Sequence, residues 1–326
     1  MPVARARAFS NIAFVKYWGN ADDALRLPLN NTISMNLDGL YTETEVRWSN
    51  ALQQDELILN GHVAEEAARR RVSRHLDYLR HRFSLNDHAS VVSNNNFPMG
   101  AGIASSASAF AALTAAAVAA ANQQISEAEM STLARLGSGS ASRSVPGGFV
   151  EWYAGTSHET SYAETIAPAN HWKLVDLITI IRDEHKSTGS QEGHTLAVTS
   201  ELQKARIEGG NQRAQRCREA LLHREFLEFA EVVEHDSNLM HAVMMTSQPP
   251  LFYWAPATLT VMSSVRAWRE QGHQVCYTID AGPNVHCICV ENEVPWLESQ
   301  LRAIPGVKDV LKASPGGPAQ VISTQP

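Results

Sequence analysis

The sequence lacks the features that mark membrane-spanning, nucleic-acid-binding and disulfide-stabilised proteins. Apart from one alanine-rich stretch, no apolar run of about 18 residues occurs, and alanine is too weakly apolar to favour a membrane span. The formal net charge is −7, so no nucleic-acid partner is expected, and an anionic ligand would need a local basic cluster. The cysteines show no paired metal spacing, which predicts free thiols in a reducing, cytoplasmic compartment: Cys217, Cys276, Cys287 and Cys289.

Two common nucleotide-binding loops and one metal motif are also absent. The glycine-containing stretch near residue 100 has no Lys-Ser or Lys-Thr to complete a Walker A loop. It also lacks the third glycine and the acidic partner of a dinucleotide-binding fingerprint. His158 and Glu159 begin a zinc-protease pattern, but Tyr162 occupies the place of the second histidine. The N-terminus has only a short apolar stretch, so we expect mature sequence rather than a signal peptide.

The length and apolar content predict two domains or one large one. The chain has 326 residues, of which 44% are hydrophobic, enough for a substantial core. Residues 174–182, LVDLITIIR, read as a buried strand that follows a looser segment. We therefore expect an N-terminal domain at 1–175 and a C-terminal domain at 176–326. The tail from residue 314 is expected to be short and partly loose.

Residues 98–121, PMGAGIASSASAFAALTAAAVAAA, predict a loop that leads into a buried helix. Gly100 and Gly102 allow the backbone to approach a phosphate closely. Ser105 and Ser106 can cap the helix or contact a phosphate or its Mg²⁺. The unpaired N–H groups and the dipole at the helix N-terminus favour an anion. The same residues also fit an ordinary capped core helix, so this stretch alone leaves both interpretations open.

The remaining periodicity predicts a mixture of strands and helices. A first strand is expected within residues 4–19, and residues 25–48 alternate as strands with a turn near Asp38-Gly39. A hairpin is expected at Asn60-Gly61 and a helix over residues 64–83. The second half reads as helices through about residue 246, a further helix after the prolines at 250–256, and two β-rich runs flanking residues 280–284.

Two charged residues stand in segments suited to a site. Arg143 is the one charge in the small-residue loop at 137–148, where a guanidinium could clamp a carboxylate or phosphate through two hydrogen bonds, or could satisfy carbonyls structurally. Asp280 lies where a strand breaks into a turn, a usual place for a catalytic carboxylate. The following Gly282-Pro283 also fit a plain turn-forming aspartate.

Together these stretches resemble a known family. PMGAGIASSASAFAAL resembles the phosphate-binding loop of the GHMP kinase superfamily, and NIAFVKYWG, SGSASRS, GGFVEW and YTIDAGPNVH resemble diphosphomevalonate decarboxylases. The resemblance implies an α+β, two-domain GHMP kinase fold. An N-terminal mixed-sheet domain would pack on a C-terminal ferredoxin-like α+β domain, with the active site in the cleft. It further implies ATP with Mg²⁺ as cofactors, a small mevalonate phosphate as substrate, decarboxylation after phosphorylation of the 3-hydroxyl, and a homodimer.

The resemblance also assigns roles to individual residues. Asp280 would accept or orient the proton of the tertiary hydroxyl, Lys16 would hold that carboxylate ionised, and Arg143 would clamp the substrate carboxylate. The implied substrate-binding residues are Tyr17, Trp18, Asn20, Ser138, Ser140, Ser190, Gln191 and Arg71. The implied ATP-binding residues are Gly100, Ala101, Gly102, Ala104, Ser105, Ser106, Ser93 and Asn95, with Ser106 also the Mg²⁺ ligand.

Two positions depart from the family pattern. Asn20 stands where the family usually has a lysine, and Ser190-Gln191 aligns with a Ser-Arg pair whose arginine helps to hold the diphosphate. Hydrogen bonds to charged groups are each worth about 1.5–3 kcal/mol, so losing two cations would weaken diphosphate binding on the order of a hundredfold. We therefore hypothesise that the substrate is mevalonate 5-phosphate and the product isopentenyl phosphate.

Other interpretations remain open. The arginines at 69–71, which would otherwise form a solvated face, or Lys186 could supply the missing charge and keep the diphosphate as substrate. A kinase that stops at the 3-phosphate would share the ATP loop but release no carbon dioxide. A non-catalytic binding protein on the same fold would be expected to lose Asp280 or Arg143, and this chain has both.

Overall fold

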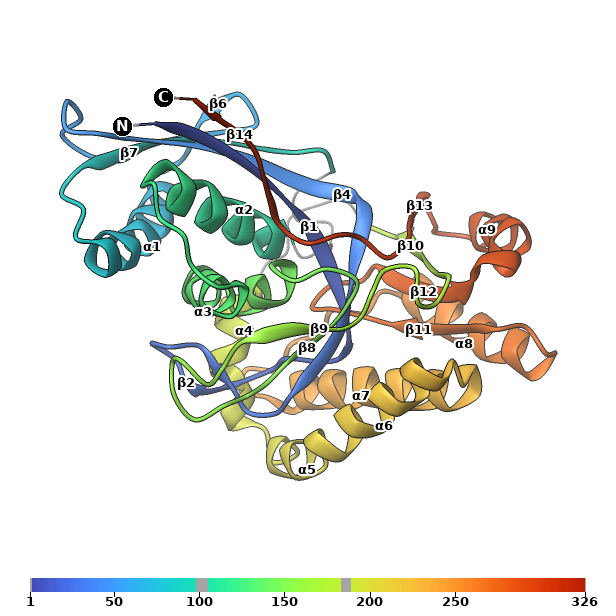
Figure 1. Cartoon of the computed structure of the whole chain (residues 1–326). Helices are drawn as coiled ribbons and strands as arrows, with labels where there is room; N and C mark the ends of the chain where they lie inside the picture. The colour runs from blue at the N-terminus through green and yellow to red at the C-terminus, as the bar shows by residue number, and fades with distance from the viewer. Residues whose placement is uncertain (1, 98–104, 183–188, 326) are drawn as a thin grey trace.

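The structure is a computed structural model that describes residues 2–97, 105–182 and 189–325 (Figure 1). Its strands are β1 (Val3–Val15), β2 (Asn20–Asp22), β3 (Leu27–Pro28), β4 (Thr32–Ser49), β5 (Glu56–Leu59), β6 (His62–Val63), β7 (His88–Asn95), β8 (Phe149–Trp152), β9 (Ala163–Ala167), β10 (Leu174–Ile180), β11 (Val275–Thr278), β12 (Val285–Val290), β13 (Asp309–Ala313) and β14 (Gln320–Gln325). Its α-helices are α1 (Glu66–Phe83), α2 (Ser105–Ala120), α3 (Glu127–Gly137), α4 (Ser190–Leu196), α5 (Gln203–Glu208), α6 (Gly210–His223), α7 (Phe226–Thr246), α8 (Pro256–Glu270) and α9 (Val294–Arg302), and a 3₁₀-helix, η1 (Gly139–Ser144), follows α3.

The larger sheet is mixed and carries three helices on one side. Its strand order is β14-β1-β4-β7-β5-β6, with β8 also paired to β4 and β9 to β8. β5 runs parallel to β7, whereas the other pairs are antiparallel. Ala4, Ala6 and Ala8 alternate along β1 and are fully buried in one core with residues of α1, α2 and α3. These small side chains leave room for the alanine-rich α2 to pack closely on the sheet (Figure 1).

The second sheet is antiparallel, has the order β11-β12-β10-β13, and is buried on both faces. Leu174 and Ile178 of β10 join a core with residues of β1, β4, α6 and α7. Val175 and Leu177 face the opposite core, which includes residues of α8 and α9. Burial on both faces explains why this strand is apolar apart from Asp176 and Thr179. The first core includes residues from both sheets, so it fixes the larger sheet against the C-terminal helices.

Two expectations about the backbone are wrong. Residues 25–48 do not turn at Asp38-Gly39, because β4 continues through them and pairs with β1 on both sides of a bulge. Ser10 faces Leu37 while Phe9 faces Tyr41, so residues 38–40 are the extra segment, and Gly39 takes a φ of +85° there. The tail is ordered, because β14 pairs with β1 along the edge of the larger sheet. The division at residues 175 and 176 stays a prediction.

Other expectations are confirmed. The hairpin turns at Asn60-Gly61 with positive φ at both residues, as a two-residue turn requires. The helix expected at 64–83 is α1, and the four cysteines are buried free thiols.

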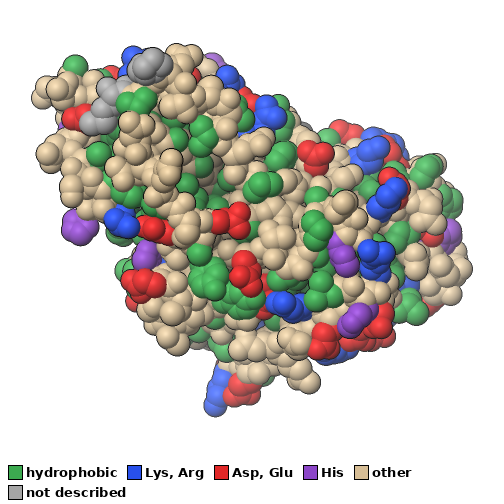
Figure 2. Space-filling view, viewed as in Figure 1, with side chains coloured by type: hydrophobic (Ala, Val, Ile, Leu, Met, Phe, Trp, Pro, Cys, Tyr) green, Lys and Arg blue, Asp and Glu red, His purple; other side chains and the backbone are tan. Residues whose placement is uncertain are grey.

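Within the described residues, no helix is both long enough and apolar enough to span a membrane. On the face in view, acidic and basic side chains are interspersed (Figure 2).

Candidate active site

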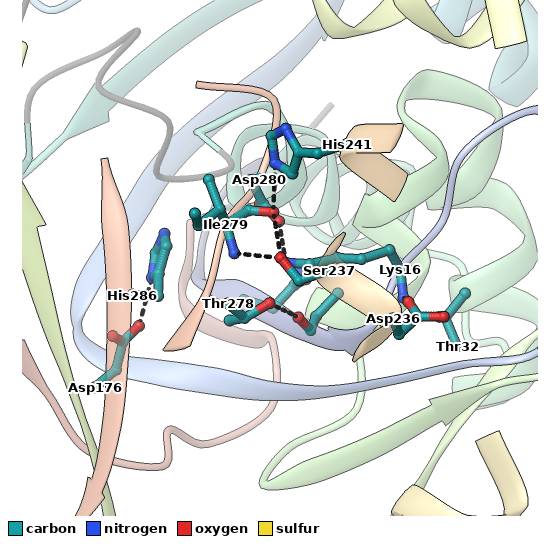
Figure 3. Close-up of polar contacts among 12 residues, drawn as sticks. Lys16, Thr32, Asp176, Asp236, Ser237, His241, Thr278, Ile279, Asp280 and His286 are labelled. Carbon is teal, nitrogen blue, oxygen red and sulfur yellow. Dashed lines mark hydrogen bonds and ion pairs between the residues drawn. The ribbon is translucent and has the colours of Figure 1, made fainter. Parts of the chain in front are cut away.

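An ion pair between the two halves of the chain joins Lys16 and Asp280. Lys16 follows β1, Asp280 follows β11, and Lys16 Nζ lies 2.6 Å from Asp280 Oδ1 (Figure 3). The Lys16 side chain is 2% exposed and the Asp280 side chain 27%, so the carboxylate is the member that a substrate can reach. Burial alone would raise the pKa of Asp280, but the nearby positive groups, Lys16 foremost and then His286 and Arg143, together outweigh it and hold that pKa below its usual value.

Buried polar groups from the C-terminal helices fix the main chain around Lys16. The Lys16 N–H donates to Asp236 of α7 at 2.6 Å, and Arg206 of α5 donates to the Lys16 carbonyl at 2.8 Å. Arg213 of α6 donates to the other oxygen of Asp236 at 2.7 Å, so this fully buried carboxylate is paired with a cation. The lysine thereby approaches Asp280 from a backbone that cannot shift without breaking hydrogen bonds to buried charged side chains.

Arg143 lies in η1 and is held by two side chains of the larger sheet. Its Nε and Nη2 donate to Asn11 Oδ1 at 3.2 and 3.1 Å, and its Nη1 donates to Thr32 Oγ1 at 3.1 Å. Burial lowers the pKa of Arg143 to about 10, and the Asp280 carboxylate opposes that effect, so the two groups lie within electrostatic range. Neutral partners orient the guanidinium and leave its charge for an anion.

The turn that carries Asp280 is anchored on α7. The Ile279 N–H donates to Ser237 Oγ at 3.0 Å, and His241 Nε2 lies 3.4 Å from the Ile279 carbonyl oxygen (Figure 3). Burial, together with the Lys16 charge, lowers the pKa of His241 to about 3, so it is neutral near pH 7. A neutral histidine can hold the strand end without adding charge to the pair beside it.

Serine hydroxyls connect the start of α2 with η1. Ser106 Oγ lies 3.1 Å from Ser138 Oγ, which lies 3.4 Å from Ser140 Oγ. The glycine between the last two is required by space, because a Cβ on Gly139 would lie 2.5 Å from the Tyr17 ring. The structure therefore brings predicted ATP-binding and substrate-binding serines into one row beside Tyr17.

Aromatic side chains line the next part of the site. His194 of α4 lies between Tyr17 and Trp18, with ring centroids 4.2 and 4.7 Å away. The Trp18 indole nitrogen is buried without a hydrogen-bond partner among the described residues. Both polar atoms of the Asn20 side chain have hydrogen-bond partners. Its Oδ1 accepts from the Tyr17 hydroxyl, and its Nδ2 donates to Asp23 at 2.8 Å.

The remaining predicted residues fall into three groups. Ser93 and Asn95 lie on β7, where their side chains bond to Thr44 and Thr42 of the neighbouring strand. Ser105 is half-buried at the start of α2. The loop residues and the side chains of two α4 residues lie outside the described part of the chain: Gly100, Ala101, Gly102, Ala104, Ser190 and Gln191.

Of the arginines at 69–71, one turns towards this region. Arg69 and Arg70 pair with Glu66 on the exposed side of α1, whereas Arg71 donates to the Gly137 carbonyl at 3.3 Å and lies over the Phe110 ring. Sequence reasoning missed several polar residues around the site, and no local pattern marks them: Asn11, Arg26, Thr32, His194, Arg206, Arg213 and Asp236.

Comparisons with known proteins identify the family and the fold. Residues 8–163 match the family described as the diphosphomevalonate decarboxylase-like N-terminal domain, and residues 176–320 match the mevalonate 5-diphosphate decarboxylase C-terminal domain. A diphosphomevalonate decarboxylase of Candida albicans is 38% identical over 84% of this chain and 80% of its own length. A crystal structure of mevalonate diphosphate decarboxylase from Staphylococcus aureus superposes with a TM-score of 0.94, 35% identity and 99% coverage of both chains. A structure described as MDDEF in complex with MVAPP, AMPPCP and magnesium gives a TM-score of 0.93 at 35% identity, covering 99% of this chain and 100% of the other.

Proposed function

The chain belongs to the diphosphomevalonate decarboxylase family, and from that premise we propose that it catalyses the ATP-dependent decarboxylation of a 5-phosphorylated mevalonate. The observation that carries the proposal is the Lys16–Asp280 pair at 2.6 Å with Arg143 in electrostatic range. This arrangement supplies an ionised carboxylate for a tertiary hydroxyl and a buried guanidinium for a carboxylate, the two groups that the substrate class combines.

Each of these residues has a separate task in the proposed reaction. Asp280 orients the 3-hydroxyl and takes its proton, and Lys16 keeps Asp280 ionised. Arg143 holds the substrate carboxylate, which places the carbon–carbon bond for cleavage. Loss of carbon dioxide leaves an electron pair that forms the new double bond as the 3-phosphate departs.

The residues at the start of α2 fit ATP with Mg²⁺. This 16-residue helix begins with half-buried serines and has no acidic residue in its first turn, so no side chain of that turn neutralises the positive end of its dipole. Ser105 and Ser106 would hold the phosphates, with Ser106 also placed for the metal. ATP with Mg²⁺ would supply the phosphoryl group that turns the 3-hydroxyl into a leaving group. The nucleotide analogue and magnesium of the similar solved structure support this assignment.

For the phosphorylated end we propose mevalonate 5-phosphate as the preferred substrate. The position of Asn20 is neutral, and its amide is already engaged with Tyr17 and Asp23. The nearby Asp23 carboxylate also acts on Tyr17 and disfavours additional negative charge. A phosphate monoester carries about two negative charges at neutral pH and makes the smaller demand on cations.

The second candidate substrate is mevalonate 5-diphosphate. The similarity to relatives named for that substrate favours it, because this chain follows them over most of its length. Both candidates use the same catalytic residues, and they differ only at the phosphate end.

Carbon dioxide release with ATP and Mg²⁺ tests the proposal. We expect kcat/KM to be higher with mevalonate 5-phosphate than with the 5-diphosphate. A clear preference for the diphosphate would select the second candidate. ADP release without carbon dioxide would instead indicate a kinase, and no turnover of either ester would indicate a binding protein. The homodimer and the cytoplasmic location stay predictions, and the mass of the purified protein in solution tests the first.

A further inference from the structure

Three arginine side chains meet at the C-terminal end of α3. Arg26 Nε donates to the Leu136 carbonyl at 3.0 Å, and Arg71 Nη2 donates to the next carbonyl, that of Gly137, at 3.3 Å. Arg135, from the last turn of α3, donates to the carbonyl of Leu25, the residue before Arg26. The three guanidinium groups come from the turn between β2 and β3, from α1 and from α3. Ser138 of the serine row (Ser106, Ser138 and Ser140) directly follows Gly137 in the sequence.

No carboxylate balances this cluster. In the described ranges, none of these arginines forms an ion pair, whereas Arg213 behind Lys16 and Arg69 and Arg70 on the outer face of α1 do. The Nε atoms of Arg71 and Arg135 are buried without a hydrogen-bond partner there. The pKa of both residues is lowered to about 10, chiefly by burial, and at Arg71 the Arg26 charge contributes to that shift. Asp22 and Glu159 act on Arg135 only as more distant charges.

Capping of α3 explains only part of this arrangement. Basic side chains are favourable at a helix C-terminus, and two of the three donate there. Neutral hydrogen bonds to carbonyls, and for Arg135 also to the His158 ring, are, however, a small return for holding like charges together in a partly buried cluster. An anion that enters the cluster would supply the missing counter-charge and acceptors.

We propose that Arg26, together with Arg71, binds the 5-phosphate group of the substrate. Arg26 stands in the turn between β2 and β3, in the hairpin that also carries Asn20, and it takes a left-handed φ of +53° there. Among the charges acting on Tyr17, which stands beside the serine row, that of Arg26 is the largest. Two guanidinium groups match the charge of one phosphate monoester. Arg135 is fully buried and positions the turn through Leu25.

The inference rests on the proposed function, and kinetics with two substitutions tests it. Arg26→Gln is expected to raise KM for mevalonate 5-phosphate about 10- to 100-fold, with kcat and the KM for ATP little changed. Arg26→Lys keeps the charge but loses the paired donors, so its KM for mevalonate 5-phosphate is expected to lie between those of the wild type and Arg26→Gln. The matched control is Arg70→Gln. Arg70 is next to Arg71 in the sequence, but its side chain is 70% exposed and pairs with Glu66. An increase confined to the KM for ATP, or no change in either KM, would overturn the inference.

A binding measurement separates this inference from the proposed function. Inorganic phosphate is titrated calorimetrically into each variant with a non-hydrolysable ATP analogue and Mg²⁺ already bound. Phosphate affinity is expected to fall about tenfold or more in Arg26→Gln and to stay unchanged in Arg70→Gln. Equal affinity in all variants overturns the inference even if the enzyme is active. Weakened phosphate binding in a protein that turns over neither ester would support the site and reject the proposed reaction. If Arg26→Gln does not fold, wild type against Arg26→Lys is judged by the same criteria.

Discussion

The two ends of the candidate site differ in how the charges of their cationic side chains are balanced. At the catalytic end, Lys16 is paired with Asp280, and Arg213 is paired with Asp236. At the phosphate end, Arg26 and Arg71 contact carbonyl oxygens and no carboxylate of the described chain. These two pairs are balanced before a ligand arrives, and Arg143 beside them keeps its charge for the substrate carboxylate, whereas the arginines of the second end gain their counter-charge from the ligand.

This difference separates preorganisation from recognition. A paired carboxylate and lysine keep their geometry without substrate, which suits groups that act in the transition state. An unbalanced cationic cluster carries an unfavourable interaction that an anion relieves, which suits groups that select a ligand. Changes at the catalytic end should therefore lower kcat or stability, and changes at the phosphate end should alter KM.

The largest expected effect is at Asp280. Asp280→Asn keeps the size and polarity of the side chain but removes the proton acceptor, so kcat should fall on the order of 10³-fold while the substrate KM changes little. Carbon dioxide release measures this directly. Asp77→Asn is the control, since Asp77 is 67% exposed on α1, and it should retain wild-type rates. A near-normal rate in Asp280→Asn would remove Asp280 from the mechanism.

The second prediction concerns the buried pair behind Lys16. Arg213→Met leaves the fully buried Asp236 carboxylate without its cation and should lower the free energy of unfolding by about 3 kcal/mol. Arg216→Met in the same helix breaks an exposed pair with Glu228 and should cost less than about 1 kcal/mol. Urea unfolding of both variants provides the comparison. Equal losses would mean that Asp236 does not depend on Arg213.

Acid should destabilise both ends through buried histidines. Burial lowers the pKa of His75, near Arg26 and Arg71, and that of His241, near Lys16, to about 3 each. Unfolded histidine has a pKa of about 6.5, so below that pH the unfolded chain binds protons that the folded chain does not. The free energy of unfolding should be unaffected by these groups above pH ~6.5 and fall as pH drops towards ~3, on the order of 1 kcal/mol per pH unit for each.

Urea unfolding between pH 7 and pH 5 measures that slope. His75→Gln and His241→Gln should each reduce it, and the two reductions assign the effect to one end of the site or the other. A slope that stays as steep in both variants would place the acid-sensitive groups elsewhere.

The smallest expected effect is in the serine row. Ser138→Ala removes the hydroxyl between Ser106 and Ser140, so one hydrogen bond to substrate or to its neighbours is lost. A neutral hydrogen bond is worth about 1 kcal/mol, which corresponds to a roughly fivefold fall in kcat/KM. Steady-state kinetics with Thr260→Ala as control, an exposed hydroxyl on α8, tests it. A loss as large as that of Asp280→Asn would mean that Ser138 acts in the chemical step.

Much of the fold could be predicted because its signals are local. The apolar run of β10 reports burial on both faces, Asn60-Gly61 reports a two-residue turn, and the motif strings identify the family. The expected turn at Asp38-Gly39 failed because the residues that favour a turn also favour a bulge, and only the pairing of β4 with β1 decides between them.

By itself the sequence determined the family and the neutral side chain at Asn20, and it indicated candidate catalytic residues that stay predictions. Tertiary structure decided which charges meet. Lys16 and Asp280 are 264 positions apart, and Arg143 and its partner Asn11 are 132 apart. Arg71 was already implied as a substrate-binding residue, but nothing in the sequence linked it to Arg26 and Arg135 until packing brought α1, α3 and the β2–β3 turn together at Leu136 and Gly137. Periodicity reports whether one residue is buried, but the energy of a charge depends on which others are buried beside it, and only the folded chain specifies that.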